Sequence, residues 1–174
     1  MKPILFLDVD GPLNPWQAKS HRRPDGYETH RMRPSGWQEP WRKPLRVWLN
    51  PQHGPQLLAL PYTLVWGTTW GEEANEWIAP HIGLPTLPVV DWPELHAKRG
   101  DGTYFKTWDL VAYAAGRPFA WVDDEIRQAD RDYVDRCHDG PALLHHVSPR
   151  LGLLPADFET LAAWAASLDE EAAA

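Results

Sequence analysis

The sequence predicts an α/β protein with a parallel β-sheet and helices on both of its faces. Short apolar segments rich in strand-forming residues alternate with segments of helical character from residue 4 to residue 168. Strands separated by helices pair in parallel through right-handed crossovers. Polar or acidic residues follow three of the expected strands, and ligands bind at the carboxyl edge of such sheets. We therefore expect five strands in the spatial order 3-2-1-4-5.

The first expected strand ends in two carboxylates. Residues 4–7 are apolar, and Asp8-Val9-Asp10-Gly11 follow them. Because side chains alternate along a strand, Asp8 and Asp10 point the same way and can share one site. A calcium loop of the EF-hand type is excluded, since its glycine stands at the sixth position and here Gly11 directly follows Asp10. The simpler alternative is two solvated aspartates in a turn that ends a strand.

An irregular insert is expected between the first two strands, over residues 15–55. Its stretch 16–53 carries eight of the 17 lysines and arginines but three acidic residues, so it has a charge of +5 while the rest of the chain has −12. Two interpretations stay open. Trp37, Trp41 and Arg42 could recognise substrate by stacking on bases and contacting phosphates, or the tryptophans could only pack a small flap onto the sheet.

The second expected strand, over residues 62–66, ends in two hydroxyl groups. Thr68 and Thr69 follow it directly after Gly67, and either hydroxyl could contact a ligand at this edge of the sheet. Thr68 is preferred because it is closer to the end of the strand, although it could instead cap the following helix. That helix is expected over residues 72–80, and a short third strand near residues 87–90.

Lys106 stands at the start of a helix that is expected to run to residue 116. Lys106 could be a functional residue or simply a solvated lysine in the first turn of the helix. If it is only solvated, Lys98 is the obvious substitute as the functional lysine. The rest of the chain continues the alternation, with a strand over 119–122, a helix over 125–136, a strand over 142–147, a helix over 155–168 and a frayed tail over 169–174. Asp123 and Asp124 directly follow the fourth strand. They could also favour the N-terminus of the next helix electrostatically.

This order of polar groups resembles the haloacid dehalogenase (HAD) superfamily of phosphohydrolases. The corresponding segments are DVDGPLN, LVWGTTW, the lone Lys106 and WVDDE, and they span about residues 4–126. The stretch 148–153 and the helix after it also look like the small HAD-like domains associated with RNA-repair proteins. Pro12 departs from the threonine or valine that more often follows the glycine in the family. The resemblance implies a three-layer, Rossmann-like fold in which the insert at 15–55 forms a small flap or cap.

The resemblance also implies a Mg²⁺-dependent phosphatase that works through an aspartyl-phosphate. Asp8 would be the nucleophile and a metal ligand, and Asp10 would be the general acid and base and a ligand through its backbone carbonyl. Asp124 is favoured as the direct metal ligand, with Asp123 behind it or paired to Lys106. Lys106 and the hydroxyl of Thr68, or that of Thr69, would hold the phosphoryl group. Several carboxylates at one sheet edge suit Mg²⁺, which prefers oxygen ligands.

The expected substrate is a phosphorylated small molecule or a nucleotide, and a phosphorylated nucleic-acid end is also open because so short a flap leaves the site accessible. The main alternative is a non-catalytic nucleic-acid-binding module that has kept the fold. A haloalkanoate dehalogenase is disfavoured because it would not need Asp10. A receiver-like phosphoacceptor is disfavoured because its acidic pair and its phosphorylated aspartate lie on different strands.

Composition agrees with a single domain over residues 1–174. The chain has the size of an ordinary domain, and 43% hydrophobic residues can fill one core. A single cysteine, Cys137, excludes an intramolecular disulfide and a cysteine-rich zinc site. No stretch approaches the roughly 20 apolar residues of a membrane span, and the start lacks the pattern of a secretory signal. We expect a soluble, cytoplasmic protein with no membrane partner.

Overall fold

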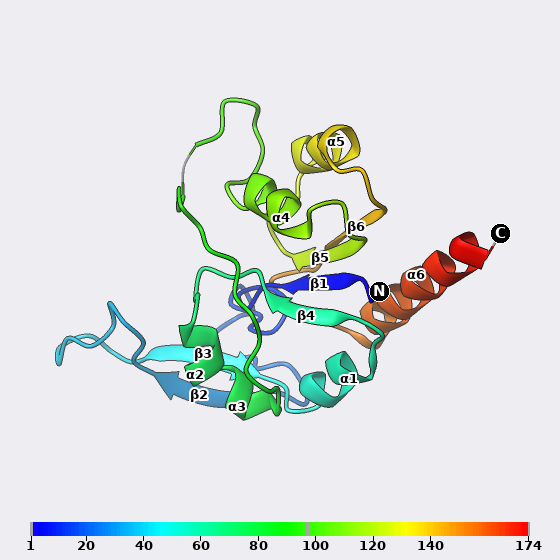
Figure 1. Cartoon of the computed structure of the whole chain (residues 1–174). Coiled ribbons are helices and arrows are strands. Elements are labelled where there is room, and N and C mark those ends of the chain that lie inside the picture. Colours follow the sequence, from blue (N-terminus) through cyan, green and yellow to red (C-terminus); the bar gives the residue numbers. More distant parts are fainter. Residues whose placement is uncertain (1, 97, 174) are drawn as a thin grey trace.

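The computed structural model describes residues 2–96 and 98–173, and its central element is a parallel sheet. The strands of this sheet are β1 (Ile4–Leu7), β4 (Thr63–Trp66), β5 (Phe119–Asp123) and β6 (Ala142–His146). They lie in the order β4-β1-β5-β6, and each neighbouring pair is parallel. Figure 1 shows β1 between β4 and β5, with helices above and below the sheet. The predicted α/β class with a parallel sheet is confirmed.

The expected third strand near residues 87–90 forms only an isolated parallel bridge, between Trp66 and Val89. The Trp66 N–H donates to the carbonyl of Pro88 at 2.8 Å, and the Val90 N–H donates to the carbonyl of Trp66 at 3.0 Å. Proline has no N–H to donate, so Pro85 and Pro88 limit the ladder to this short stretch. The sheet therefore has four strands, and the five-strand order 3-2-1-4-5 is not confirmed.

The helices begin and end at the following residues: α1 (His53–Ala59), α2 (Glu73–Trp77), α3 (Ala79–Ile82), α4 (Thr107–Ala114), α5 (Gln128–Cys137) and α6 (Pro155–Ala173). They form two groups, one on each face of the sheet, so β1 is buried on both faces. Leu5 and Leu7 contribute to the core shared with α1, α2, α3 and α6, whereas Ile4 and Phe6 contribute to the core shared with α4 and α5. Burial on both faces explains the unbroken apolar run of this strand.

The insert is not irregular, contrary to the prediction. Strands β2 (Glu28–Met32) and β3 (Leu45–Leu49) pair antiparallel within it, and we call this pair the hairpin. Met32, Val47 and Leu49 are buried in the core that includes Leu5 and Leu7. Helix α1 also begins inside the expected range of the insert. The sequence of β2 is mostly polar, so its strand conformation depends on its pairing with β3 rather than on local propensity.

Three expected helices have different limits in the structure. The helix over 72–80 splits into α2 and α3, because Pro80 has no N–H to continue the first of them. Helix α5 begins at Gln128 rather than at residue 125, since the Asp130 carboxylate accepts the Arg127 N–H and fixes the start there. Helix α6 continues to Ala173 instead of fraying after residue 168, and residue 174 lies outside the described residues. Within residues 2–96 and 98–173, no helix is long and apolar enough to cross a membrane.

Candidate functional site

Three carboxylates meet at the carboxyl edge of the sheet. Asp8 directly follows β1, Asp123 is the last residue of β5, and Asp124 comes next. The two strands are paired side by side, with Leu7 opposite Val122, so the residues that follow them are neighbours. One oxygen from each carboxylate lies within 4.8 Å of the others. A hard divalent cation such as Mg²⁺ prefers oxygen donors of this kind.

Lys106 connects two of these carboxylates. Its side chain is 1% exposed, and its Nζ lies 2.9 Å from Asp8 Oδ2 and 2.7 Å from Asp123 Oδ2. Asp123 also accepts hydrogen bonds from the Trp121 indole at 3.1 Å and from the Glu125 N–H at 2.9 Å. Both carboxylate oxygens of Asp123 therefore have hydrogen-bond donors within the protein. Lys98, the substitute considered for Lys106, is exposed.

The charges of this cluster are not balanced. Burial raises the pKa of Asp8 to about 8; Lys106 opposes this rise, and the charges of Asp123 and Asp10 add to it. Burial also raises the pKa of Asp124 to about 6, although the hydrogen bond from Trp16 lowers it. Burial alone would lower the pKa of Lys106, but the two carboxylates that it contacts raise it above its ordinary value. A bound cation would relieve the excess negative charge.

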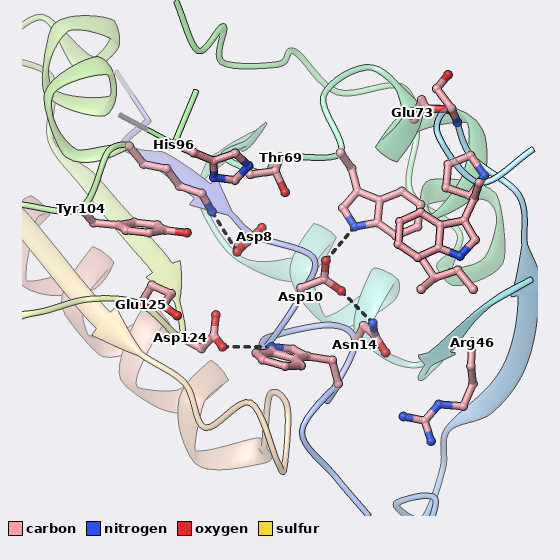
Figure 2. Close-up of a pocket in the computed structure, with 17 residues that line it drawn as sticks. Asp8, Asp10, Asn14, Arg46, Thr69, Glu73, His96, Tyr104, Asp124 and Glu125 are labelled. Atoms are coloured by element: carbon pink, nitrogen blue, oxygen red, sulfur yellow. Dashed lines mark hydrogen bonds and ion pairs between the residues drawn. The ribbon is translucent and has the colours of Figure 1, made fainter. Parts of the chain in front are cut away.

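Asp10 is held by a hydrogen bond to each of its carboxylate oxygens. The Asn14 amide donates to Oδ1 at 2.7 Å, and the Trp70 indole donates to Oδ2 at 3.0 Å. Figure 2 shows both bonds, with Asp8 and Asp124 on the same side of the cavity. These two bonds fix the carboxylate at the mouth of the acidic cluster.

The turn between Asp10 and Asn14 requires glycine at Gly11. Its φ is +98°, and a Cβ atom there would lie 2.6 to 2.7 Å from the Asp124 side chain. Glycine adopts such a φ readily and leaves room for that side chain. Pro12 lies in the same turn, and its carbonyl accepts the Leu153 N–H at 2.8 Å. The unusual residue therefore also connects the turn to the loop that precedes α6.

A cavity of about 680 Å³ opens above the cluster. Figure 2 shows Tyr104 and Glu125 on one side of it and Arg46 and Glu73 on the other. Its lining residues come from the sheet edge, the hairpin and the loops before α2 and α4: Asp8, Asp10, Asn14, Trp16, Pro34, Ser35, Trp37, Leu45, Arg46, Thr69, Trp70, Glu73, His96, Tyr104, Lys106, Asp124 and Glu125. Acidic and aromatic side chains thus line the cavity on both sides, and Arg46 is the one arginine among the lining residues.

The cavity contains many of the residues selected from the sequence: Asp8, Asp10, Thr69, Lys106, Asp124 and Trp37. Asp123 lies behind them, paired to Lys106. Thr68, the preferred threonine, is fully buried and is not part of the cavity wall; its hydroxyl accepts the Trp70 N–H at 3.3 Å. Thr69 is therefore the better placed hydroxyl.

Two of the expected substrate-binding residues lie outside the cavity. Trp41 is 84% exposed, and Arg42 stacks on Trp37, with its guanidinium carbon 3.3 Å from the ring centroid. Sequence reasoning missed the contributions of Asn14, Trp70 and Arg46. The first two adjoin the acidic and threonine motifs, so their proximity to those motifs was a usable signal. Arg46 has no such local signal, because the pairing of β3 with β2 brings it to the site.

No family model, curated protein or solved structure matches this chain. The geometry of the site and the order of its motifs are therefore the basis for assigning a function.

Proposed function

We propose that the protein is a Mg²⁺-dependent phosphohydrolase of the HAD type that works through an aspartyl-phosphate intermediate. The observation that supports this most is the buried arrangement of Asp8, Lys106 and Asp123 at the carboxyl edge of the sheet, open on one side to a cavity. An ion pair that only contributes surface charge would lie in solvent, whereas Lys106 and its two carboxylates are buried. A buried lysine between two carboxylates suits a site in which one carboxylate reacts and the positive charge assists.

The donors present fit Mg²⁺. The Asp8 carboxylate, the Asp10 backbone carbonyl and the Asp124 carboxylate would hold the ion. Asp124 is half-buried and lines the cavity, whereas Asp123 is engaged by Lys106 and Trp121, which favours Asp124 as the direct ligand. When bound, Mg²⁺ neutralises phosphoryl charge and lets an anionic nucleophile approach.

The residues of the chain divide the reaction between them. A carboxylate oxygen of Asp8 attacks phosphorus; the new O–P bond forms as the bond from phosphorus to the leaving oxygen breaks, and protonated Asp10 gives its proton to that oxygen. A water molecule then attacks the same phosphorus, Asp10 takes a proton from it, and the O–P bond to Asp8 breaks. Inorganic phosphate leaves, and both aspartates return to their starting states. Lys106 and the Thr69 hydroxyl stabilise the phosphoryl oxygens meanwhile.

Phosphatase assays with Mg²⁺ and an aryl phosphate test this assignment. The Asp8→Asn variant should keep its fold and lose about three decades or more of turnover, since removing a covalent nucleophile disables the catalytic unit. Asp135→Asn, on the exposed side of α5, is the matched control and should retain full activity. Turnover in Asp8→Asn close to that of the wild type would refute the mechanism.

The cavity wall favours a nucleotide or a phosphorylated nucleic-acid end over a small sugar phosphate. Trp16 is 48% exposed and Trp37 is partly exposed; both line the cavity together with Arg46. Such a wall can stack a base and contact an anion. Trp37→Ala should lower kcat/KM for a nucleotide about 10-fold, by loss of stacking, and leave that for an aryl phosphate nearly unchanged. Trp41→Ala, outside the cavity, is the control; an equal loss with both substrates in Trp37→Ala would indicate a packing role.

The second candidate is a nucleic-acid-binding module without catalysis. The positive charge of the insert and its tryptophans favour it, since phosphate contacts and base stacking need no reactive aspartate. A module of this kind would bind single-stranded RNA or DNA with salt-dependent affinity and release no phosphate from any substrate. The same purified protein therefore distinguishes the two candidates.

A further inference from the structure

The Asn14 side chain connects the acidic site to the hairpin. It is 4% exposed, and both ends of its amide are used. Nδ2 donates to Asp10 Oδ1 at 2.7 Å, and Oδ1 accepts the backbone N–H of Trp48, in β3, at 3.0 Å. The two bonds fix the orientation of the amide, because a backbone N–H can only donate and so requires the oxygen on its side.

The backbone of Asn14 is fixed as well. Its N–H donates to the carbonyl of Val9 at 2.8 Å, and its carbonyl accepts the N–H groups of Gly11 at 2.9 Å and Trp16 at 2.7 Å. The side chain therefore extends from a rigid turn, and its two partners determine where it points. Asp10 and Trp48 belong to segments far apart in the sequence that this one amide holds together.

Strand β3 also faces the cavity. Leu45 and Arg46 line it, and the Arg46 guanidinium lies 3.8 Å over the ring of Trp48. The Trp48 indole donates to the Thr29 hydroxyl of β2 at 2.9 Å, which ties it to the rest of the hairpin. A ligand that contacts Arg46 thus contacts the same strand whose Trp48 N–H donates to Asn14.

We propose that Asn14 is a positioning residue that holds Asp10 in the orientation for proton transfer. Through its bond to the Trp48 N–H, Asn14 also makes this orientation depend on the position of strand β3. The inference rests on the proposed function, in which Asp10 gives a proton to the leaving oxygen. When β3 is seated, the amide holds Asp10 Oδ1, the Trp70 indole holds Oδ2, and the carboxylate faces the cavity. When β3 shifts away, Asn14 loses the partner that orients it, and Asp10 loses one of its two donors.

The test exploits the leaving group. A simple alkyl phosphate has a poor leaving group and needs a proton from Asp10, whereas 4-nitrophenyl phosphate needs it little. Asn14→Ala should therefore lower kcat for the alkyl phosphate by about 10- to 100-fold with KM nearly unchanged, within the range of general acid catalysis, and change kcat for 4-nitrophenyl phosphate by less than about 3-fold. Asn50→Ala is the matched control, since the Asn50 side chain accepts the Gln52 N–H outside the cavity and should affect neither substrate.

Asn14→Asp separates the two contacts. It keeps an acceptor for the Trp48 N–H but offers no amide donor to Asp10, so it should show the same selective loss with the alkyl phosphate. Amide hydrogen exchange gives a readout that does not depend on activity: the Trp48 N–H should exchange faster in Asn14→Ala and stay protected in Asn14→Asp. Asn14→Asp also reports on Asp10 where the alanine variant folds poorly.

The outcomes distinguish this proposal from the proposed function. A wild-type protein that hydrolyses neither phosphate overturns both. An active wild type with an inactive Asp8→Asn variant supports the proposed function, and equal losses of Asn14→Ala and Asn14→Asp on the two phosphates, or no loss on either, then overturn the positioning role alone. Unchanged exchange of the Trp48 N–H in Asn14→Ala overturns the link to β3.

Discussion

Asp8 is a candidate catalytic residue whose pKa its surroundings raise. It is 6% exposed and has Asp123 as a second buried carboxylate across Lys106. Burial raises the pKa of Asp8 to about 8, and the charges of Asp123 and Asp10 add to this rise, because the single charge of Lys106 lowers the pKa too little to offset them. In the proposed mechanism, a protonated carboxyl group is a poor nucleophile until a cation lowers its pKa, so we expect the reactivity of Asp8 to depend on the metal.

Mg²⁺ binding should therefore release protons. At pH 7 most metal-free molecules hold a proton on Asp8, because its pKa is about 8, and a metal ligand must be ionised. We expect nearly one proton released per ion at pH 7, with affinity rising from pH 6 to pH 8. Titration calorimetry in two buffers of different ionisation enthalpy measures the number of protons released per bound Mg²⁺. Binding at pH 7 without proton release would contradict the charge imbalance, and Asp8→Asn should abolish the release.

The motifs predicted which acidic residues meet, because the residues that follow β1 and β5 must lie together in a parallel sheet. They did not predict how each is held. Trp70 and Asn14 adjoin the motifs, yet the donor of Asn14 reaches Asp10 through the Gly11 turn, and that of Trp70 reaches it from the loop after β4. The preference for Thr68 used distance along the chain, and the bend after β4 brings Thr69 rather than Thr68 to the cavity wall.

Helices α4 and α5 are joined by Asp130, which is fully buried. Its Oδ1 accepts the Tyr104 N–H at 2.6 Å and the Thr107 hydroxyl at 2.5 Å, and its Oδ2 accepts the Arg127 N–H at 2.8 Å. Tyr104 and Thr107 flank Lys106, so one carboxylate on α5 fixes the backbone that presents the lysine. The start of α5 and the position of Lys106 have the same physical cause.

Asp130→Ala should lower the free energy of unfolding by about 3 kcal/mol, since it leaves the buried Thr107 hydroxyl and the partly buried N–H groups of Tyr104 and Arg127 without their acceptor. Turnover should fall as well, because the backbone around Lys106 loses its support. Urea denaturation and the aryl phosphate assay measure the two effects. Asp135→Ala, on an exposed position of the same helix, should change stability by less than about 0.5 kcal/mol. A stable Asp130→Ala variant with full turnover would contradict this role.

Local sequence patterns predicted the elements that carry their own signal and failed where distant residues decide. The apolar runs of β1, β4, β5 and β6 are such signals, and each forms a strand near its expected place. Strand β2 has the sequence ETHRM, which suggests no strand until β3 pairs with it. The segment at 87–90 has the apolar residues of a strand, but Pro85 before it and Pro88 within it restrict it to a bridge.

Across the whole molecule, the hairpin, α1 and α6 meet on the face of the sheet opposite α4 and α5, and Figure 1 shows these elements together. The part of the cavity wall that β3 supplies, Leu45 and Arg46, depends on this packing, since it places β3 beside the sheet edge. The sequence located the acidic half of the site, whose residues follow strands. The other half depends on a hairpin whose pairing and seating are long-range, so only Trp37 of the three residues selected from the insert lines the cavity.

His53 is a probe of this packing. It belongs to α1, is 3% exposed, and its ring lies between those of Tyr27 and Phe158, at centroid distances of 5.5 and 5.7 Å. Burial lowers the pKa of His53 to about 4, although a hydrogen bond with the Leu153 backbone and the charge of Asp157 oppose the shift. The folded protein therefore keeps this histidine neutral where the unfolded chain, with an ordinary histidine pKa of about 6.5, protonates it.

Acid should weaken the fold through His53. A histidine whose pKa is lowered on folding contributes its full stability above about pH 6.5 and loses it as the pH falls toward 4. The unfolding free energy of the wild type, relative to that of His53→Gln, should fall by about 3 kcal/mol between pH 7 and pH 4. The difference between the two proteins is the quantity to measure, by urea denaturation at several pH values, because the raised pKa of Asp8 shifts stability in the opposite direction in both. Parallel pH profiles for the two proteins would show that His53 is solvated and that the hairpin, α1 and α6 do not close around it.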